Sequence, residues 1–157
     1  MIHSKLFIPA AVIILVGITA CSDATAPTQP APGGIASVRS GSFRVVKNCT
    51  GYQGQPGQTC TVTSSTLKEI EKGSTITYTS GADLNGFLST DVILDLPGAG
   101  NNTAFGHCEL SLVTGIGVCT FSGGTGKFTW FRAAADVSPL GDMNFAWDGT
   151  YRFGPRD

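Results

Sequence analysis

The aspartates and the histidine in the central part of the chain are the residues best suited to proton transfer. Six aspartates are scattered over predicted turns and strand ends: Asp83, Asp91, Asp95, Asp136, Asp142 and Asp148. No two of them have a spacing that requires acid–base catalysis. A Ser-His-Asp arrangement would have to use His107, but no serine lies in a Gly-x-Ser-x-Gly turn that presents a nucleophile. The pattern favours a protein that is not an enzyme, and it assigns no catalytic residue.

Four cysteines form two pairs with equal spacing, which suits either disulfides or a metal site. Cys49 and Cys60 are eleven residues apart, and so are Cys108 and Cys119. This spacing matches no zinc pattern, and only His107 could add a nitrogen ligand, so we expect no metal. Because His107 directly precedes Cys108 on a predicted strand, its side chain points to the opposite face, and we interpret it as a surface histidine.

Hairpin geometry favours disulfides between neighbouring cysteines in the sequence. A turn near Gly54 would place the first two sulfurs face to face. The second pair encloses residues 114–117, which lie off the midpoint, so its hairpin needs a bulge or a shifted turn. Four cysteines allow three pairings, and we favour the sequential one.

Residues 121–128 read Phe-Ser-Gly-Gly-Thr-Gly-Lys-Phe and imitate a phosphate-binding loop. That motif needs glycine where this chain has Phe121 and a hydroxyl where it has Phe128. The segment also joins two predicted strands, whereas a phosphate loop joins a strand to a helix. We therefore expect a tight corner with Phe128 returning to the core. The corner consists of Gly123, Gly124, Thr125 and Gly126.

The amino-terminal residues predict export and lipid attachment. Lys5 gives a short cationic start, and an apolar run follows it. The run ends in Ile18-Thr-Ala-Cys21, and this tetrapeptide resembles a bacterial lipobox. The run is too short to span a membrane and is followed by polar residues, so residues 1–20 are predicted to be a lipoprotein signal peptide. Cleavage before Cys21 and acylation of that residue would anchor the protein in a membrane. Ser22 resembles the sorting residue of outer-membrane lipoproteins, so we expect the outer membrane of a bacterial cell envelope.

Residues 21–34 are predicted to be the lipidated amino terminus and a disordered linker, because they hold three prolines and almost no large apolar group. Lys5 accounts for one of the ten basic residues, so nine remain against eleven acidic ones after the leader. This balance gives no basic surplus for nucleic acid. We expect no nucleic-acid partner and no cofactor.

Residues 35–157 predict a single all-β domain, since short apolar–polar alternations are separated by turn residues. Residues 144–153 alternate best, with Phe145, Trp147, Tyr151 and Phe153 on one face and polar residues on the other. Residues 131–137 form a second such row, and residues 75–79 and 87–94 give two more strands. We interpret residues 66–72 as a strand end, with a single helical turn as the alternative.

Three charged residues on these strands are the first candidates for a polar site inside a barrel. They are Arg132, Asp136 and Asp148. Their alternation places them opposite the apolar rows, so we expect them to point outward.

The Gly-Gly-Thr-Gly-Lys-Phe corner at residues 123–128 is similar to the corner of allene oxide cyclase and dirigent-like barrels. It also resembles small bacterial lipoproteins of unassigned function that share this corner. The resemblance implies a calycin- or dirigent-like antiparallel β-barrel of about eight strands that can hold a small apolar ligand. It transfers no catalytic residue, and the disulfides and lipid anchor depart from the plant enzymes.

These features together predict a membrane-anchored envelope lipoprotein whose barrel binds a small ligand or a partner. The alternative is a cyclase-, isomerase- or dirigent-like protein that shapes a hydrophobic small molecule. A barrel packed solid by Phe145, Trp147 and Tyr151 would exclude a cavity. A cavity with a buried carboxylate and arginine would favour the enzyme.

Overall fold

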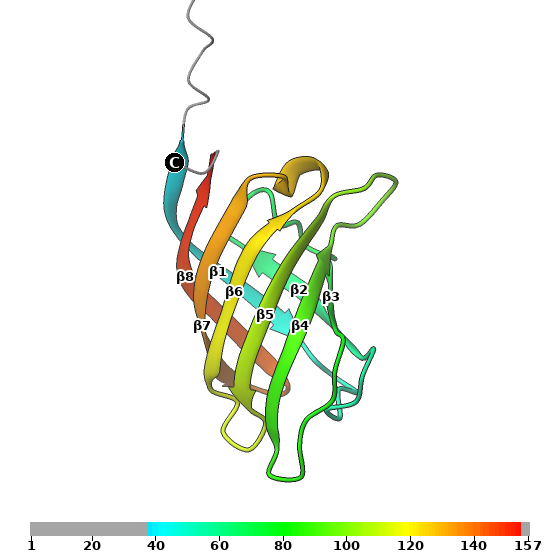
Figure 1. Cartoon of the computed structure of the whole chain (residues 1–157). Helices are drawn as coiled ribbons and strands as arrows, with labels where there is room; N and C mark the ends of the chain where they lie inside the picture. The colour runs from blue at the N-terminus through cyan, green and yellow to red at the C-terminus, as the bar shows by residue number, and fades with distance from the viewer. Residues whose placement is uncertain (1–37, 155–157) are drawn as a thin grey trace, which may run out of the picture. The chain divides into compact units, whose positions relative to one another are not determined.

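A computed structural model describes residues 38–154 of the chain (Figure 1). Eight strands occupy most of this range: β1 (Arg39–Asn48), β2 (Thr59–Ser65), β3 (Thr75–Tyr78), β4 (Phe87–Asp95), β5 (Thr103–Ser111), β6 (Gly117–Gly124), β7 (Phe131–Gly141) and β8 (Asn144–Phe153). Each strand pairs antiparallel with the next, and β8 pairs with β1 to close a barrel. The predicted all-β, eight-stranded antiparallel barrel is confirmed.

Several sequence predictions lie outside the described residues. These are the signal peptide at residues 1–20, lipidation of Cys21, the linker at residues 21–34 and the start of the domain at residue 35. No helix within residues 38–154 has the length and apolar character needed to cross a bilayer.

Alternating burial explains why the strands close around one core. On β7, Phe131, Ala135 and Val137 are buried while the residues between them are more exposed, as predicted. On β8, Trp147 is fully buried and Phe153 packs against the core. Gly149 lets β7 and β8 approach closely, because a Cβ there would lie 1.9 Å from the carbonyl oxygen of Ala134.

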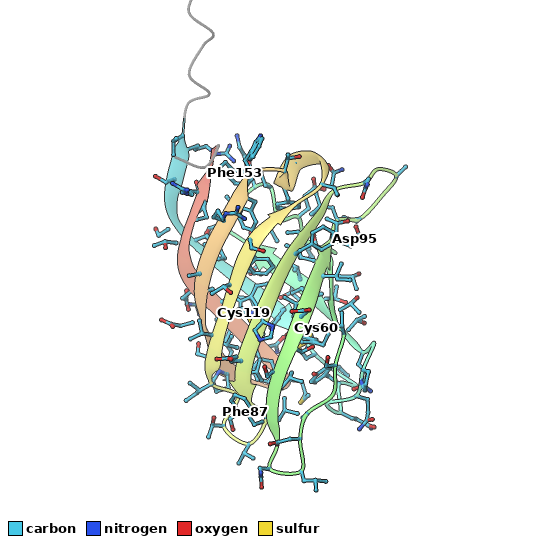
Figure 2. The ribbon with its side chains drawn as sticks, in the orientation of Figure 1. Cys60, Phe87, Asp95, Cys119 and Phe153 are labelled. Atoms are coloured by element: carbon cyan, nitrogen blue, oxygen red, sulfur yellow. A yellow bond between two sulfur atoms is a disulfide. The ribbon has the colours of Figure 1, made fainter. Side chains whose placement is uncertain are left out.

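Aromatic rings fill one end of the barrel. Phe131 packs against Phe128 and Phe153, with ring centroids 5.2 and 5.0 Å apart. Phe121 connects this cluster to Trp147 in the middle of the barrel, at 5.4 Å. Figure 2 shows Phe153 toward this filled end and Phe87 toward the other end.

The connection between β2 and β3 also covers the filled end, and here the strand prediction for residues 66–72 was wrong. The segment forms turns, with the Ile70 amide donating to the carbonyl oxygen of Leu67. Both side chains are buried. The three-residue spacing of Leu67 and Ile70 fits a turn that directs both inward, whereas a strand would have pointed them to opposite faces.

The corner between β6 and β7 continues the same end. A Cβ on Gly124 would lie 2.0 Å from the carbonyl oxygen of Thr103, so the backbones of β5 and β6 can approach only with glycine there. The Thr125 hydroxyl accepts a hydrogen bond from the Thr103 amide and donates to the Asn101 carbonyl oxygen. A short 3-10 helix, η1 (Gly126–Phe128), then places Phe128 in the core.

Both disulfides follow the predicted sequential pairing, Cys49 with Cys60 and Cys108 with Cys119. The expected shifted turn in the second hairpin is confirmed, because Cys108 directly opposes Cys119 in an unbroken register down to Leu110. A bulge in the same hairpin lies on the other side of the disulfide, between Phe105 and Gly106. The connecting turn at residues 112–115 is centred on the midpoint of the pair, and the Gly115 amide closes it by donating to Ser111.

Candidate functional site

The end of the barrel opposite the aromatic cluster contains a cavity of about 320 Å³. This volume is at the small end of typical ligand sites. Its apolar lining comes from Leu88, Leu110, Leu112, Val137, Met143 and Phe145, and from the Cys49–Cys60 disulfide. Its polar lining includes Lys47, Tyr52, Gln53 and Tyr78. The barrel is therefore packed solid only in part: Trp147 fills its middle, whereas Phe145 borders an open space.

Lys47 points into this cavity because it occupies an inward position of β1. Phe43, Val45, Lys47 and Cys49 alternate along the strand and are all buried, with Lys47 only 1% exposed. Its partners in register are Val62 on β2 and Phe145 on β8. The sequence analysis missed Lys47. The alternation Phe-x-Val-x-Lys-x-Cys was the available signal, since it places a lysine in a row that otherwise faces a core.

Aromatic side chains enclose the Lys47 amine. Nζ lies 4.1 Å from the centroid of the Trp147 ring and 5.1 Å from that of Tyr78. The amine also forms a hydrogen bond with the Tyr78 hydroxyl. Tyr52, from the connection after β1, packs its ring against Tyr78 with centroids 4.9 Å apart. The lysine thus contacts one indole and one phenol, and the second phenol packs behind the first.

Burial sets the protonation of this group. Removal from water lowers the pKa of Lys47 from 10.5 to about 7. The pKa of Tyr78 is raised by burial and then by the neighbouring Tyr52, whose own pKa burial raises to about 12. Both phenols are therefore protonated at neutral pH, and a large fraction of Lys47 is a neutral amine. The Lys47 amine donates a hydrogen bond to the Tyr78 hydroxyl oxygen.

Two polar atoms of these aromatic side chains have no hydrogen-bond partner within residues 38–154. They are the Tyr52 hydroxyl oxygen and the Trp147 indole nitrogen, and both are buried. A buried polar group without a partner costs about 1–3 kcal/mol. Tyr52 also lines the cavity, while its hydroxyl oxygen is buried.

The predicted polar residues on β7 and β8 lie away from this cavity. Asp148 binds the Arg44 guanidinium through both carboxylate oxygens, at 2.7 and 2.8 Å. Asp136 opposes Asp148 in register and is exposed, whereas Arg132 opposes Arg152. Arg132 is four residues along the strand from Asp136, about 13 Å at the usual rise. The structure brings the two aspartates together on neighbouring strands and does not bring Arg132 to them.

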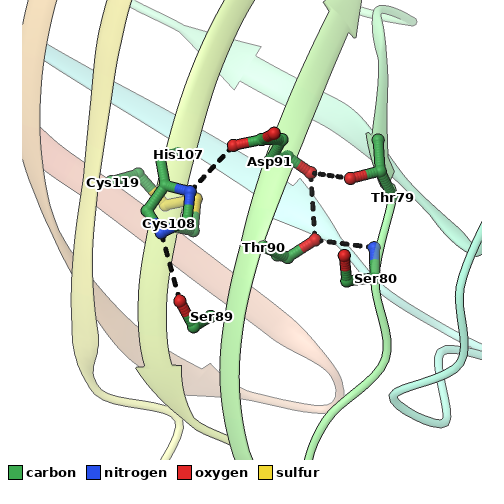
Figure 3. Close-up of polar contacts among 8 residues, drawn as sticks. All are labelled: Thr79, Ser80, Ser89, Thr90, Asp91, His107, Cys108 and Cys119. Carbon is green, nitrogen blue, oxygen red and sulfur yellow. Dashed lines mark hydrogen bonds and ion pairs between the residues drawn. A yellow bond between two sulfur atoms is a disulfide. The ribbon is translucent and has the colours of Figure 1, made fainter.

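A Ser-His-Asp hydrogen-bond chain lies on the outer face of β4 and β5 (Figure 3). Because a carboxylate only accepts, the His107 Nδ1–H donates to Asp91 at 2.8 Å, and Nε2 accepts from the Ser89 hydroxyl at 3.2 Å. The side chains of His107 and Asp91 are 44% and 76% exposed, as expected for a surface histidine. None of the three residues lines the cavity. A substrate here would stay in water, where such interactions contribute little.

Metal binding has no support in the described part of the chain. Within residues 38–154, no group of three or more His, Cys, Asp or Glu side chains could hold an ion.

Comparison with protein-family models, with curated proteins and with solved structures found no match. The candidate site therefore depends on the geometry of the barrel alone.

Proposed function

We propose that this chain is a lipid-anchored protein of the bacterial cell envelope whose barrel binds a small, largely apolar molecule in the cavity around Lys47. The cavity is the observation that carries the proposal. It combines an apolar wall with a few convergent polar groups, which is the usual composition of a small-molecule site.

Exposed apolar side chains around the same end of the barrel support entry of an apolar ligand. Leu84, Val113, Ile116 and Met143 belong to three of the connections that surround this end, and all four are exposed. Grouped apolar residues on a surface commonly mark a binding region. Met143 is also part of the cavity lining, so this apolar rim is continuous with the interior.

Export is supported by the two disulfides together with the leader sequence. Disulfides persist in oxidising compartments and are rare in the cytosol. The resemblance of residues 123–128 to dirigent-like and lipoprotein barrels agrees with a ligand-holding interior. The cyclase or isomerase alternative gains nothing from the cavity, whose described lining contains no aspartate, glutamate or arginine.

Photo-crosslinking tests ligand binding with the full-length protein in detergent. An alkyl diazirine should label the peptides that line the cavity, and excess 1-octanol should reduce this labelling. Val137→Trp should abolish most of it, because Val137 is 2% exposed and its larger replacement fills the cavity. Val118→Trp is the matched control, since Val118 is exposed on the neighbouring strand β6. Labelling that is equal in both variants would refute the proposed site.

A further inference from the structure

We propose that the ligand carries an aldehyde or ketone and that the Lys47 amine condenses with this carbonyl to form an imine. The inference rests on the proposed binding function and names the chemical class of the ligand. Three features of the site support it: the surroundings of the amine, the position of a phenol and the apolar wall.

The surroundings of Lys47 favour a neutral nucleophile. In the described residues no carboxylate pairs with its amine: its register partners are Val62 and Phe145, and Tyr78 and Tyr52 are the titratable groups of the cavity lining beside it. An anionic ligand group would require the charged ammonium form of Lys47. That form is unfavourable where the amine is buried among aromatic rings. A carbonyl requires the unprotonated amine, which is the form that this interior stabilises, with a pKa near 7.

Tyr78 is placed to handle the protons of the reaction. The neutral Nζ attacks the carbonyl carbon, the π electrons move to the oxygen, and one N–H proton is transferred to that oxygen, which gives a carbinolamine. The Tyr78 hydroxyl is hydrogen bonded to Nζ and can protonate the departing hydroxyl group. Water leaves, and the iminium N–H returns its proton to the Tyr78 oxygen. The products are a neutral imine and one water, so no oxidant or reductant is needed.

The remaining cavity suits the rest of such a ligand. The apolar walls, formed in part by Leu88, Leu110 and Leu112, can hold an alkyl or aryl chain. They also exclude water, which would otherwise hydrolyse the imine.

Reductive trapping of octanal tests the inference in the full-length protein. Sodium cyanoborohydride converts an imine into a stable secondary amine, and peptide mass spectrometry locates the added octyl group. We expect at least tenfold more label on Lys47 than on the exposed Lys68, Lys72 and Lys127 at pH 7, because only Lys47 lies beside an apolar cavity that can hold the alkyl chain of octanal. Labelling of Lys47 should rise with pH and level off above a pH of about 7.

Three variants and one competitor separate the possible results. Lys47→Met should lose the preferred label, and Lys127→Met should keep it. Tyr78→Phe should lower the rate of trapping several-fold and change its pH profile, which a purely structural role would not do. Excess 1-octanol, which has the same chain without a carbonyl, should suppress trapping at Lys47 and leave the surface lysines unaffected.

The two proposals fail in different ways. If octanal leaves Lys47 unlabelled while the alkyl diazirine still labels the cavity, the carbonyl inference is wrong and ligand binding stands. If neither reagent reaches the cavity, the proposed binding function is wrong and the carbonyl inference falls with it.

Discussion

Lys47 places an amine at a buried position where most protein cores have an aliphatic side chain. The surrounding rings of Trp147 and Tyr78 provide cation–π contacts at 4.1 and 5.1 Å, yet burial still lowers the pKa of the amine to about 7. The charged form is therefore destabilising. Because the residue that carries this cost lines a cavity, it is a candidate functional group.

The pH dependence of stability should report this cost. The unfolded chain binds a proton at Lys47 up to a pH of about 10.5 and the folded chain only up to about 7, so the free energy of unfolding should rise with pH between these values. We expect a gain of about 2–3 kcal/mol between pH 6 and pH 9, measured by urea unfolding. Lys47→Met should remove this slope and be more stable than the wild type at pH 6.

Lys127→Met provides the matched control, because Lys127 is an exposed lysine paired with Glu71 at 2.8 Å. Its slope should equal that of the wild type. A slope in Lys47→Met that matches the wild type would show that the buried amine does not titrate as described.

The outer Ser89–His107–Asp91 chain should be chemically inert. Its members form the hydrogen bonds of a hydrolytic triad, but they lie on an exposed face without a cavity. A fluorophosphonate probe should leave Ser89 unmodified, and His107→Gln should change the free energy of unfolding by less than about 1 kcal/mol. Stoichiometric modification of Ser89 that disappears in His107→Gln would show that the chain is catalytic.

At the scale of elements, the two disulfides join neighbouring strands but differ in their relation to the site. Cys49–Cys60 joins the end of β1 to β2 and lines the cavity, whereas Cys108–Cys119 joins β5 to β6 outside the lining. Both enclose loops of the same length. Because the loops are equally long, the two disulfides should contribute similarly to the free energy of unfolding. Only Cys49–Cys60 lines the cavity, so only this disulfide should affect binding.

Paired cysteine-to-alanine variants test this division. Each double variant should lose about 2–3 kcal/mol in urea unfolding, as short disulfide loops do. Only Cys49→Ala/Cys60→Ala should also change the yield of alkyl diazirine in the cavity. An equal loss of labelling in Cys108→Ala/Cys119→Ala would mean that the site depends on the general stability of the barrel.

At the scale of the molecule, the barrel has one filled end and one end with a cavity. β1 begins at the filled end, beside Phe153 of β8, so any amino-terminal tether joins the barrel there. The cavity and its apolar rim lie at the opposite end. The first strand of the barrel therefore begins at the end opposite the cavity.

Membrane anchoring should depend on one thiol. Cells fed an alkyne fatty acid should label the wild type and Ser22→Ala equally, because Ser22 is not the modified residue. Cys21→Ala should lose all label, since the predicted acyl chains are attached only to that position. Equal labelling of Cys21→Ala and the wild type would refute the lipoprotein prediction.

Local patterns determined the all-β class, while the eight-stranded barrel was expected from the resemblance of residues 123–128 to known barrels. Alternation on residues 131–137 and 144–153 gave the inward rows, and equal cysteine spacing gave the hairpin disulfides, because strand periodicity and short loops are properties of neighbouring residues. The site was beyond such reasoning. Lys47, Tyr52 and Tyr78 come from separate segments, and they meet only because closure of the barrel brings β1, β3 and the connection after β1 around one cavity. Burial, and hence the lowered pKa of Lys47, is a consequence of that closure. For this reason the sequence predicted the strands and the disulfides, and only the tertiary structure showed a buried lysine beside a cavity.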